Sequence, residues 1–205
     1  MINTFITEYN LLNNSKQINN TKMIKTGNQT TPFAIGRVSI QDPNNKYIEE
    51  VKWGKGNQIA IAIGLNPSSI LPSLLDKTNE LVSFVLNKNG YDGYYLMNLF
   101  SFVQTNHFRR LGHIDQTDVI RNTINSFLTK NPFAHIDVIF FCGRGCYFTE
   151  NMISNLKSIT SKNVHYRLIG TNKYRHKHPG RGVSPKNINL SVPLSAIPFF
   201  GHYIR

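Results

Sequence analysis

The chain contains very little cysteine. Its two cysteines, Cys142 and Cys146, are too few for a disulfide framework or a four-cysteine iron–sulfur cluster. Their spacing could supply half of a zinc site, but Cys142 ends an apolar run, so burial as a small hydrophobic side chain is the favoured interpretation. We therefore expect no metal and no other cofactor.

Long hydrophobic runs are also absent. No apolar segment approaches the ~20 residues that cross a membrane, and residues 1–8 lack the charged start and apolar stretch of a signal peptide. A chain of 205 residues that is 40% hydrophobic and 11% aromatic has enough apolar material for one folded domain. These features predict a soluble, cytoplasmic protein with no membrane partner.

Two common nucleotide-binding signatures are missing. There is no G-x-G-x-x-G opening a helix and no G-x-x-x-x-G-K-[ST] loop, which excludes the usual dinucleotide and triphosphate cradles. No pair of carboxylates stands out for glycoside-type acid–base chemistry.

Acidic residues are scarce beside basic ones. Lysine and arginine number 23 against 11 acidic residues, a formal net charge of +12. Such an excess favours polyanionic partners, nucleic acid first and membrane surfaces second. Several of the basic residues follow a predicted strand, in the loop 171–186, where phosphate contact and an ordinary charged surface are equally compatible with the pattern; they are Lys173, Arg175, Lys177, Arg181 and Lys186.

One apolar stretch organises the rest of the chain. Residues 59–63 are wholly apolar, which is typical of a strand buried on both faces of a sheet. Gly64 ends the run, and Pro67 prevents the strand from continuing because proline fixes φ and lacks an N–H donor. A polar turn at the carboxyl end of a central strand is where open α/β sheets place ligand sites. An ordinary strand-end turn is the alternative.

The remaining patterns alternate strands with helices. A hairpin is predicted from strands at 33–40 and 47–53 around the turn 41–45. Further strands are predicted at 94–102, 135–142 and 164–170, with helices at about 78–89, 117–130 and 146–159, and Gly90 ending the first of these helices. This alternation predicts a three-layer α/β/α sandwich with a mostly parallel central sheet.

The N-terminal residues have a different composition. Residues 1–31 form a polar arm with a short helix at about 5–12, and residues 13–31 are expected to be mobile or loosely docked. Residues 32–205 form the single predicted domain.

Polar or glycine-rich residues follow the predicted strands. Gly64 to Ser68, Asn98 and the Gly143-Arg144-Gly145 turn stand at or after strand ends, and the basic loop follows the strand at 164–170. Because the carboxyl ends of parallel strands meet at one edge of a sheet, we expect these segments to converge there.

The order of these motifs resembles the uracil-DNA glycosylase superfamily. The carrying motifs are Gly64-Leu65-Asn66-Pro67-Ser68, Leu96-Met97-Asn98, Phe141-Cys142-Gly143 and His178-Pro179-Gly180. The order is similar to that superfamily's water-positioning loop, base-reading strand, hydrophobic strand and late histidine loop. The chain also resembles an uncharacterised bacterial branch with Asn-Pro-Ser, Asn-Leu-Phe and His-Pro signatures. The resemblance covers about residues 59 to 185.

The resemblance implies a monofunctional, metal-independent enzyme that flips uracil out of single- or double-stranded DNA. Asn66 would position the attacking water, and Asn98 would read the uracil edge. His178 would stabilise the charge on the departing base, as an oxyanion hole does, by ~3 kcal/mol. The remaining implied residues are Gly64, Leu65, Pro67 and Ser68 for substrate, and Arg144, Lys173, Arg175, Lys177 and Arg181 for DNA. The sequence identifies no protein inhibitor or replication partner.

Three departures from the family pattern stand out. Asn66 replaces the aspartate of the fastest members, Ser68 stands where some members carry a tyrosine that excludes thymine, and no aromatic residue between Asn66 and Phe84 can stack on the base.

Other interpretations remain open. Asn98 is also compatible with satisfying backbone groups inside a strand, and His178 with binding phosphate or standing exposed in its loop. The whole chain is compatible with a nucleic-acid-binding protein that keeps the fold with little or no catalysis. A third alternative is an unrelated α/β enzyme acting on nucleotides or RNA.

Overall fold

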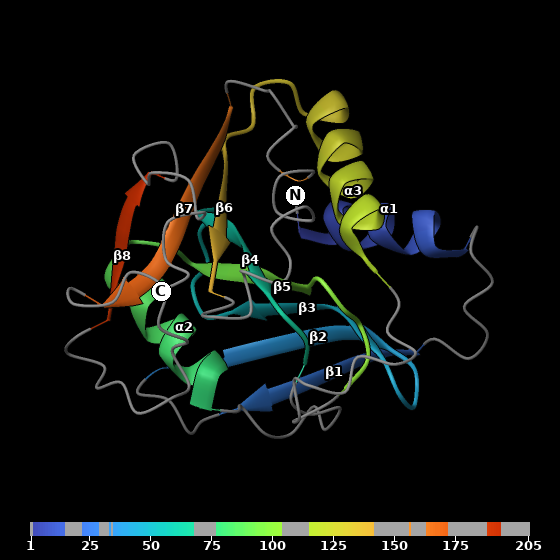
Figure 1. Ribbon diagram of the computed structural model, residues 1–205, viewed down its shortest axis with the longest axis horizontal. Coiled ribbons are helices and arrows are strands. Elements are labelled where there is room, and N and C mark those ends of the chain that lie inside the picture. The colour runs from blue at the N-terminus through green and yellow to red at the C-terminus, as the bar shows by residue number, and fades with distance from the viewer. Residues whose placement is uncertain are drawn as a thin grey trace, which may run out of the picture.

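The computed structural model describes residues 2–14, 22–28, 33, 35–67, 77–103, 115–141, 156, 163–171 and 188–193. These residues form an α/β fold (Figure 1). In chain order its elements are α1 (Ile2–Asn14), β1 (Lys22–Asn28), β2 (Ile35–Gln41), β3 (Lys46–Lys52), β4 (Ile59–Gly64), α2 (Lys77–Lys88), β5 (Gly93–Asn98), α3 (Thr117–Lys130), β6 (Ile136–Phe140), β7 (Val164–Thr171) and β8 (Ile188–Pro193).

The sheet is mixed, and the prediction of a mostly parallel sheet is wrong. The described strands lie in the order β1-β2-β3-β5-β4-β6-β7-β8. Among these strands, only the four central ones, β5, β4, β6 and β7, run parallel to one another. The outer pairs are antiparallel. Short turns such as that between β2 and β3 can join only antiparallel strands, and the hairpin extends the sheet beside β5 instead of forming a separate unit.

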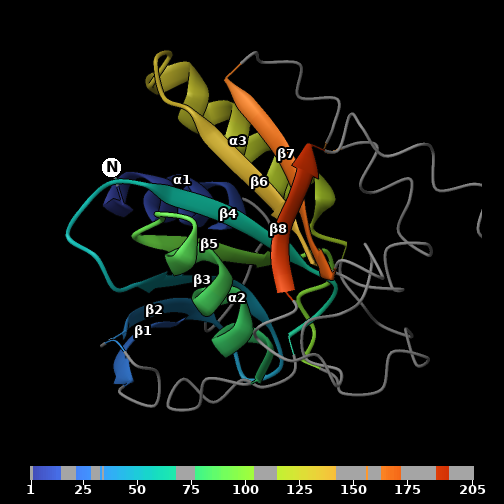
Figure 2. The same ribbon diagram turned by 90° about the vertical axis from the view of Figure 1, so that its left-hand side faces the viewer.

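Helices pack on both faces of the sheet, and each face has its own hydrophobic core (Figure 2). Side chains of α1 and α3, among them Phe5 and Ile120, pack with Ile61, Ile63 and Met97 on one face. Side chains of α2, among them Val82, pack on the opposite face with the group Ala60, Ala62, Tyr94, Leu96, Ile139 and Phe141. The apolar run 59–63 is therefore buried from both sides, as its composition predicts.

The predicted hairpin is confirmed, whereas the predicted mobile segment is not. Strands β2 and β3 pair antiparallel, and the turn between them closes with the Asp42 N–H donating to the Asn45 carbonyl at 2.9 Å. Residues 22–28, expected to be mobile or loosely docked, form β1 and pair with β2 along its whole length. This strand has no apolar alternation that would predict it. It forms because its backbone groups can pair with the open edge of β2.

The helix predictions agree with the structure where it describes them. Helix α3 spans Thr117–Lys130, as its periodicity predicts, and a helix from Ile2 to Asn14 includes the one expected near 5–12. Gly90 follows α2 with φ of +83°, a conformation that favours glycine. The helix predicted at 146–159 lies outside the described residues, apart from the buried Leu156. Among the described helices, none has the length and hydrophobicity to cross a membrane.

Candidate functional site

Three parallel strands end side by side at one edge of the sheet. In the register of β4 with β5, Gly64 lies opposite Asn98. The ladder continues past both strands, because the Leu99 N–H donates to the Gly64 carbonyl at 3.0 Å. On the other side of β4, the Phe141 N–H donates to the Ile63 carbonyl at 3.0 Å. The predicted convergence of Gly64 and Asn98 with the end of β6 is therefore confirmed.

The amide of Asn98 is enclosed at this edge. The residue is only 4% exposed and lies on the same face of the sheet as Leu96, the face that α2 covers. Its Oδ1 atom lies against Gly64, as does the ring of Phe141. An amide side chain carries one acceptor oxygen and two N–H donors, so it can bind a ligand that presents both kinds of group.

The loop after β4 places its side chains in different directions. Asn66 is half-buried, and its Nδ2 atom donates to the Pro67 carbonyl at 3.3 Å. Pro67 is buried beside it. Leu65 packs in the core on the α1 and α3 face, opposite to Asn98. The side chain of Leu65 therefore has a packing role and does not join Asn98, although its carbonyl accepts from Phe100 N–H at 2.9 Å.

The other predicted site residues lie outside the described residues. They are Ser68, Arg144, Lys173, Arg175, Lys177, His178 and Arg181.

A set of buried polar residues on β2 and β3 lies near Asn98, and no sequence motif marked it as a site. We call it the buried polar patch; each member is 6% exposed or less, and its members are Arg37, Ser39, Gln41, Lys46 and Glu49. The alternation of polar residues along β2 was the available signal, but it is usually produced by a solvent-facing strand. Burial of that face is a tertiary feature, and charged side chains are seldom buried without a partner.

The patch is held by contacts around the Glu49 carboxylate. Arg37 forms an ion pair with Glu49 Oε1, and Lys46 Nζ lies 3.3 Å from Glu49 Oε2. Ser39 lies opposite Glu49 in the β2–β3 register, and the Ser39 hydroxyl donates to Gln41 Oε1 at 3.0 Å. Two cations thus share one carboxylate in a region that is almost closed to water.

A second polar cluster lies around Asp137, near the N-terminal ends of the parallel strands. The Tyr91 hydroxyl donates to Asp137 Oδ2 at 2.7 Å, while His165 Nδ1 and Arg167 Nε lie 3.6 and 3.5 Å from Oδ1. Burial of the Tyr91 ring, together with the Asp137 carboxylate, raises the pKa of Tyr91. Asp137 is the second residue of β6, so this cluster is separate from the strand ends at Gly64 and Asn98.

Metal ligands do not gather among the described side chains. Within those ranges, no group of three or more His, Cys, Asp or Glu residues is placed to hold an ion.

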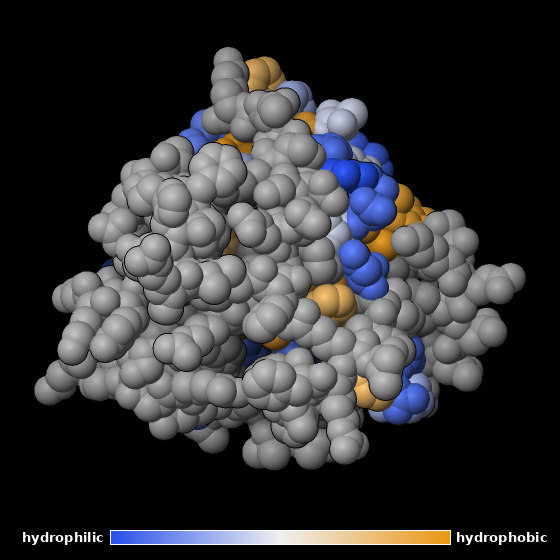
Figure 3. Space-filling view, viewed as in Figure 1, coloured by the Kyte–Doolittle hydropathy of each residue, from blue (hydrophilic) through white to orange (hydrophobic). Residues whose placement is uncertain are grey.

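The outer side of α3 presents a band of hydrophilic side chains in Figure 3.

The chain is therefore an α/β protein with a mixed sheet, in which the polar residues Asn66 and Asn98 lie at the carboxyl ends of parallel strands. The chain belongs to the family described as protein of unknown function (DUF1643), whose model matches residues 46–179. No curated protein matches it in sequence. Among solved structures, it is similar to a "putative hydrolase" from Bacillus subtilis at 10% identity, covering 78% of this chain and 47% of that chain, with a TM-score of 0.31. The chain thus spans less than half of that protein, and so low a score supports no conclusion.

Proposed function

We propose that the protein is a uracil-DNA glycosylase-like enzyme with a three-layer α/β/α architecture. It would flip uracil out of single- or double-stranded DNA and hydrolyse the N-glycosidic bond without a metal. The enclosed Asn98 amide is the observation that carries this proposal. It lies beside Gly64 and Phe141, at the edge of the sheet where open α/β folds bind ligands.

The chemistry of an amide matches the edge of uracil. The Asn98 oxygen can accept the N3–H of uracil while its NH₂ group donates to O4. Cytosine presents an acceptor at N3 and a donor at N4, so the same orientation would oppose like groups. A buried amide enforces this distinction strongly, because a wrong base leaves enclosed polar groups unpaired.

Asn66 is assigned to the attacking water. It follows β4 directly, is half-buried, and carries an amide that already contacts the Pro67 carbonyl. An amide can orient a water molecule but cannot take its proton as a carboxylate can, so we expect slower hydrolysis than in family members with aspartate. His178 keeps the role that the resemblance implies, at O2 of the departing base.

The charge of the chain supports a DNA substrate. The net charge of +12 favours a polyanion, and phosphate contacts could help offset the few kcal/mol that base flipping costs. The basic residues between 171 and 186 are the proposed source of these contacts.

The direct test is release of free uracil from a labelled oligonucleotide, followed by alkali cleavage at the abasic site. We expect release at enzyme excess, unchanged by EDTA, and none from matched oligonucleotides that carry cytosine in place of uracil. Asn66→Ala should slow release without lowering the melting temperature, because Asn66 is only half-buried. An intact uracil oligonucleotide, or loss of activity on chelation, would overturn the proposal. Tight DNA binding with no release would favour a binding protein that keeps the fold.

A further inference from the structure

We propose that Phe141 is a positioning residue, whose ring fixes the direction of the Asn98 amide and thereby decides between uracil and cytosine. This inference rests on the proposed function and names a residue that controls its base specificity. The supporting observations are the two side chains that meet over Gly64, the atoms by which they meet, and the donor and acceptor patterns of the two bases.

The backbone brings Phe141 and Asn98 to opposite sides of Gly64. Strand β4 lies between β5 and β6, so its last residue has a neighbour on each side. Gly64 pairs with Asn98 in the register of β4 with β5. On the β6 side, the Phe141 N–H donates to the Ile63 carbonyl at 3.0 Å, which places Phe141 level with the end of β4.

The two side chains share the face of the sheet that α2 covers. Phe141 packs with Leu96 in the core on that face. Asn98 follows Leu96 by two residues along β5, so its side chain points to the same face. Phe141 and Asn98 are 5% and 4% exposed, and Gly64 has no side chain to fill the space between them. Both side chains are therefore enclosed over one glycine.

The side chains meet over Gly64 by defined atoms. The point where a Cβ atom of residue 64 would stand lies 2.5 Å from Asn98 Oδ1, 2.9 Å from Phe141 Cζ and 3.2 Å from Phe141 Cε2. Cζ and Cε2 are at the far end of the ring, so the rim of the ring faces this point. The amide directs its oxygen to the same place. The Asn98 oxygen is thus a neighbour of the rim of the Phe141 ring.

This contact favours one of the two directions that the amide can take. The oxygen and the NH₂ group of asparagine are almost equal in size, so close packing alone does not distinguish an amide from the same amide after a half-turn. Charge does distinguish them. The rim hydrogens of an aromatic ring carry partial positive charge, which attracts the amide oxygen through weak C–H···O contacts and repels the N–H hydrogens. Phe141 therefore holds the oxygen toward Gly64 and directs the NH₂ group away.

The direction of the amide decides which base it matches. In the direction that Phe141 favours, the oxygen accepts the N3–H of uracil while the NH₂ group donates to O4. After a half-turn, the same amide would donate to N3 and accept from the N4 amino group, which is the pattern of cytosine. An amide free to turn would suit both bases. A fixed amide discriminates, because the wrong base leaves enclosed polar groups unpaired.

Binding of the free bases tests this role. We would measure the dissociation constants of uracil and cytosine by NMR titration of the full-length wild type, of Phe141→Leu, and of protein in which pentafluorophenylalanine replaces Phe141. Leucine removes the ring, so the cytosine-to-uracil ratio of dissociation constants should fall by about 10-fold. The fluorinated ring keeps its shape but carries a negative rim, so the ratio should fall further. Uracil release by Phe141→Leu should slow by only about twofold, because the amide keeps the productive direction roughly half of the time.

The matched control is Phe140→Leu. It makes the same change at the preceding residue, which is equally buried but packs in the core on the α1 and α3 face. This variant should lose comparable stability and keep the wild-type ratio. A ratio that is unchanged in Phe141→Leu, or that falls equally in Phe140→Leu, would overturn the role of Phe141. If Phe141→Leu does not fold, the fluorinated protein decides, and an unchanged ratio there has the same meaning.

The outcomes for the wild type separate this inference from the proposed function. If the wild type binds uracil in preference to cytosine but releases none from DNA, the proposed hydrolysis fails, whereas the comparison of the Phe141 variants still decides how the base is recognised. If the wild type binds the two bases equally, the role of Phe141 is wrong, and release of uracil from the oligonucleotide tests the proposed function by itself.

Discussion

The Oδ1 atom of Asn98 occupies the space that a side chain at position 64 would need. A Cβ atom built on Gly64 would lie 2.5 Å from Asn98 Oδ1 and 2.9 Å from Cζ of Phe141. Glycine is therefore required here by close packing between neighbouring strands, and not by a special backbone angle. The same packing fixes the position of the amide that we assign to base recognition.

Gly64→Ala should destabilise the protein. The added methyl group has to displace the Asn98 amide or the Phe141 ring, and overpacking of this kind costs about 1–3 kcal/mol. Denaturant unfolding measures the loss. Gly27→Ala is the matched control, since a Cβ there meets nothing within 4 Å. Equal stability of the two variants would contradict the close packing around Gly64.

Asn98→Asp should abolish uracil release while leaving DNA affinity almost unchanged. The substitution replaces the NH₂ donor with a second acceptor that repels uracil O4. Sites built on buried hydrogen bonds reject mispaired partners by ~10⁴-fold or more, whereas phosphate contacts dominate overall affinity.

Melting temperature, DNA affinity and release rate should be measured on one preparation of this variant. Asn57→Asp, at an exposed position, controls for the added charge. A collapse of stability would show that Asn98 is structural, because a buried carboxylate without a partner costs ~1–3 kcal/mol or more. If all three quantities are unchanged, Asn98 does not read the base.

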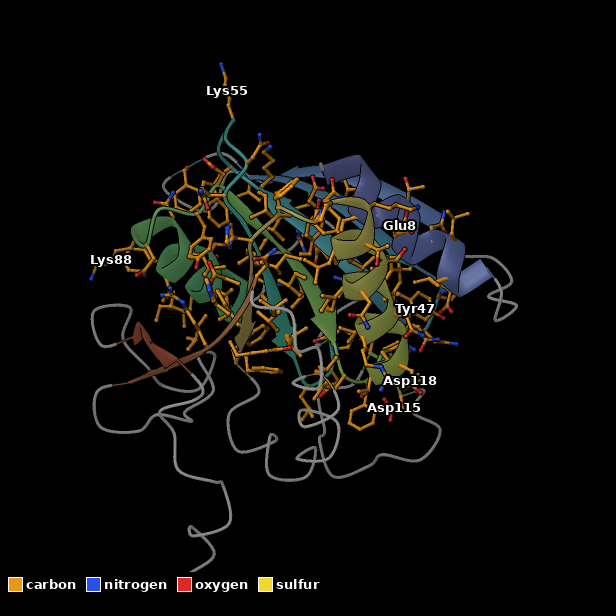
Figure 4. All side chains as sticks on the ribbon, turned by 90° about the horizontal axis from the view of Figure 1, so that it is seen from above. Glu8, Tyr47, Lys55, Lys88, Asp115 and Asp118 are labelled. Carbon is orange, nitrogen blue, oxygen red and sulfur yellow. The ribbon has the colours of Figure 1, made fainter. Side chains whose placement is uncertain are left out.

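Replacing Lys173, Arg175 and Lys177 together with glutamine should weaken DNA binding at every sequence. Each lost phosphate contact should remove about one unit from the slope of log affinity against log salt concentration. The control is the double variant of Lys55 and Lys88, which are exposed at the β3–β4 turn and at the end of α2 (Figure 4). If the triple variant keeps the wild-type slope, DNA binds elsewhere on the protein.

Glu8 should make stability depend on pH in the acid range. It joins α1 to α3 (Figure 4), and hydrogen bonds from Lys130 and Ser126 lower the pKa of Glu8 below its ordinary value of 4.5, although burial opposes this shift. A carboxylate with a lowered pKa stabilises the folded state above the ordinary value, and this contribution is lost as pH falls through the folded-state pKa.

Urea unfolding from pH 7 to pH 3 tests this prediction by comparing the wild type with Glu8→Gln. The difference in unfolding free energy should be constant above about pH 4.5 and should shrink below it. Lys130→Met removes the main partner and should weaken the same pH dependence. A difference that stays constant down to pH 3 would contradict the assignment.

Local sequence was enough to predict most individual elements. The apolar run 59–63 predicts β4, because a strand buried on both faces needs no polar alternation. The spacing of Ile120, Ile124 and Phe127 predicts α3, and the turn around Asp42 predicts the hairpin. Each of these signals comes from a few neighbouring residues. The end of α2 is also predicted locally, by Gly90.

Strand pairing was not determined locally. Residues 22–28 lack an apolar pattern and become β1 because the edge of β2 offers backbone partners. For the same reason β8, which the sequence patterns did not predict, pairs with β7. Antiparallel additions at both edges make the sheet mixed, since pairing depends on which edges meet in space.

The sequence by itself placed Asn66 after an apolar run with a clear end, and it placed Asn98 within the apolar strand predicted at 94–102, which the structure ends at Asn98. Only the tertiary structure set Gly64 opposite Asn98, turned Leu65 into the opposite core and buried Arg37, Lys46 and Glu49. A polar residue on alternate positions of a strand has the same local pattern whether its face meets water or protein. Burial is decided by what packs on that face, and this depends on residues far away in the chain.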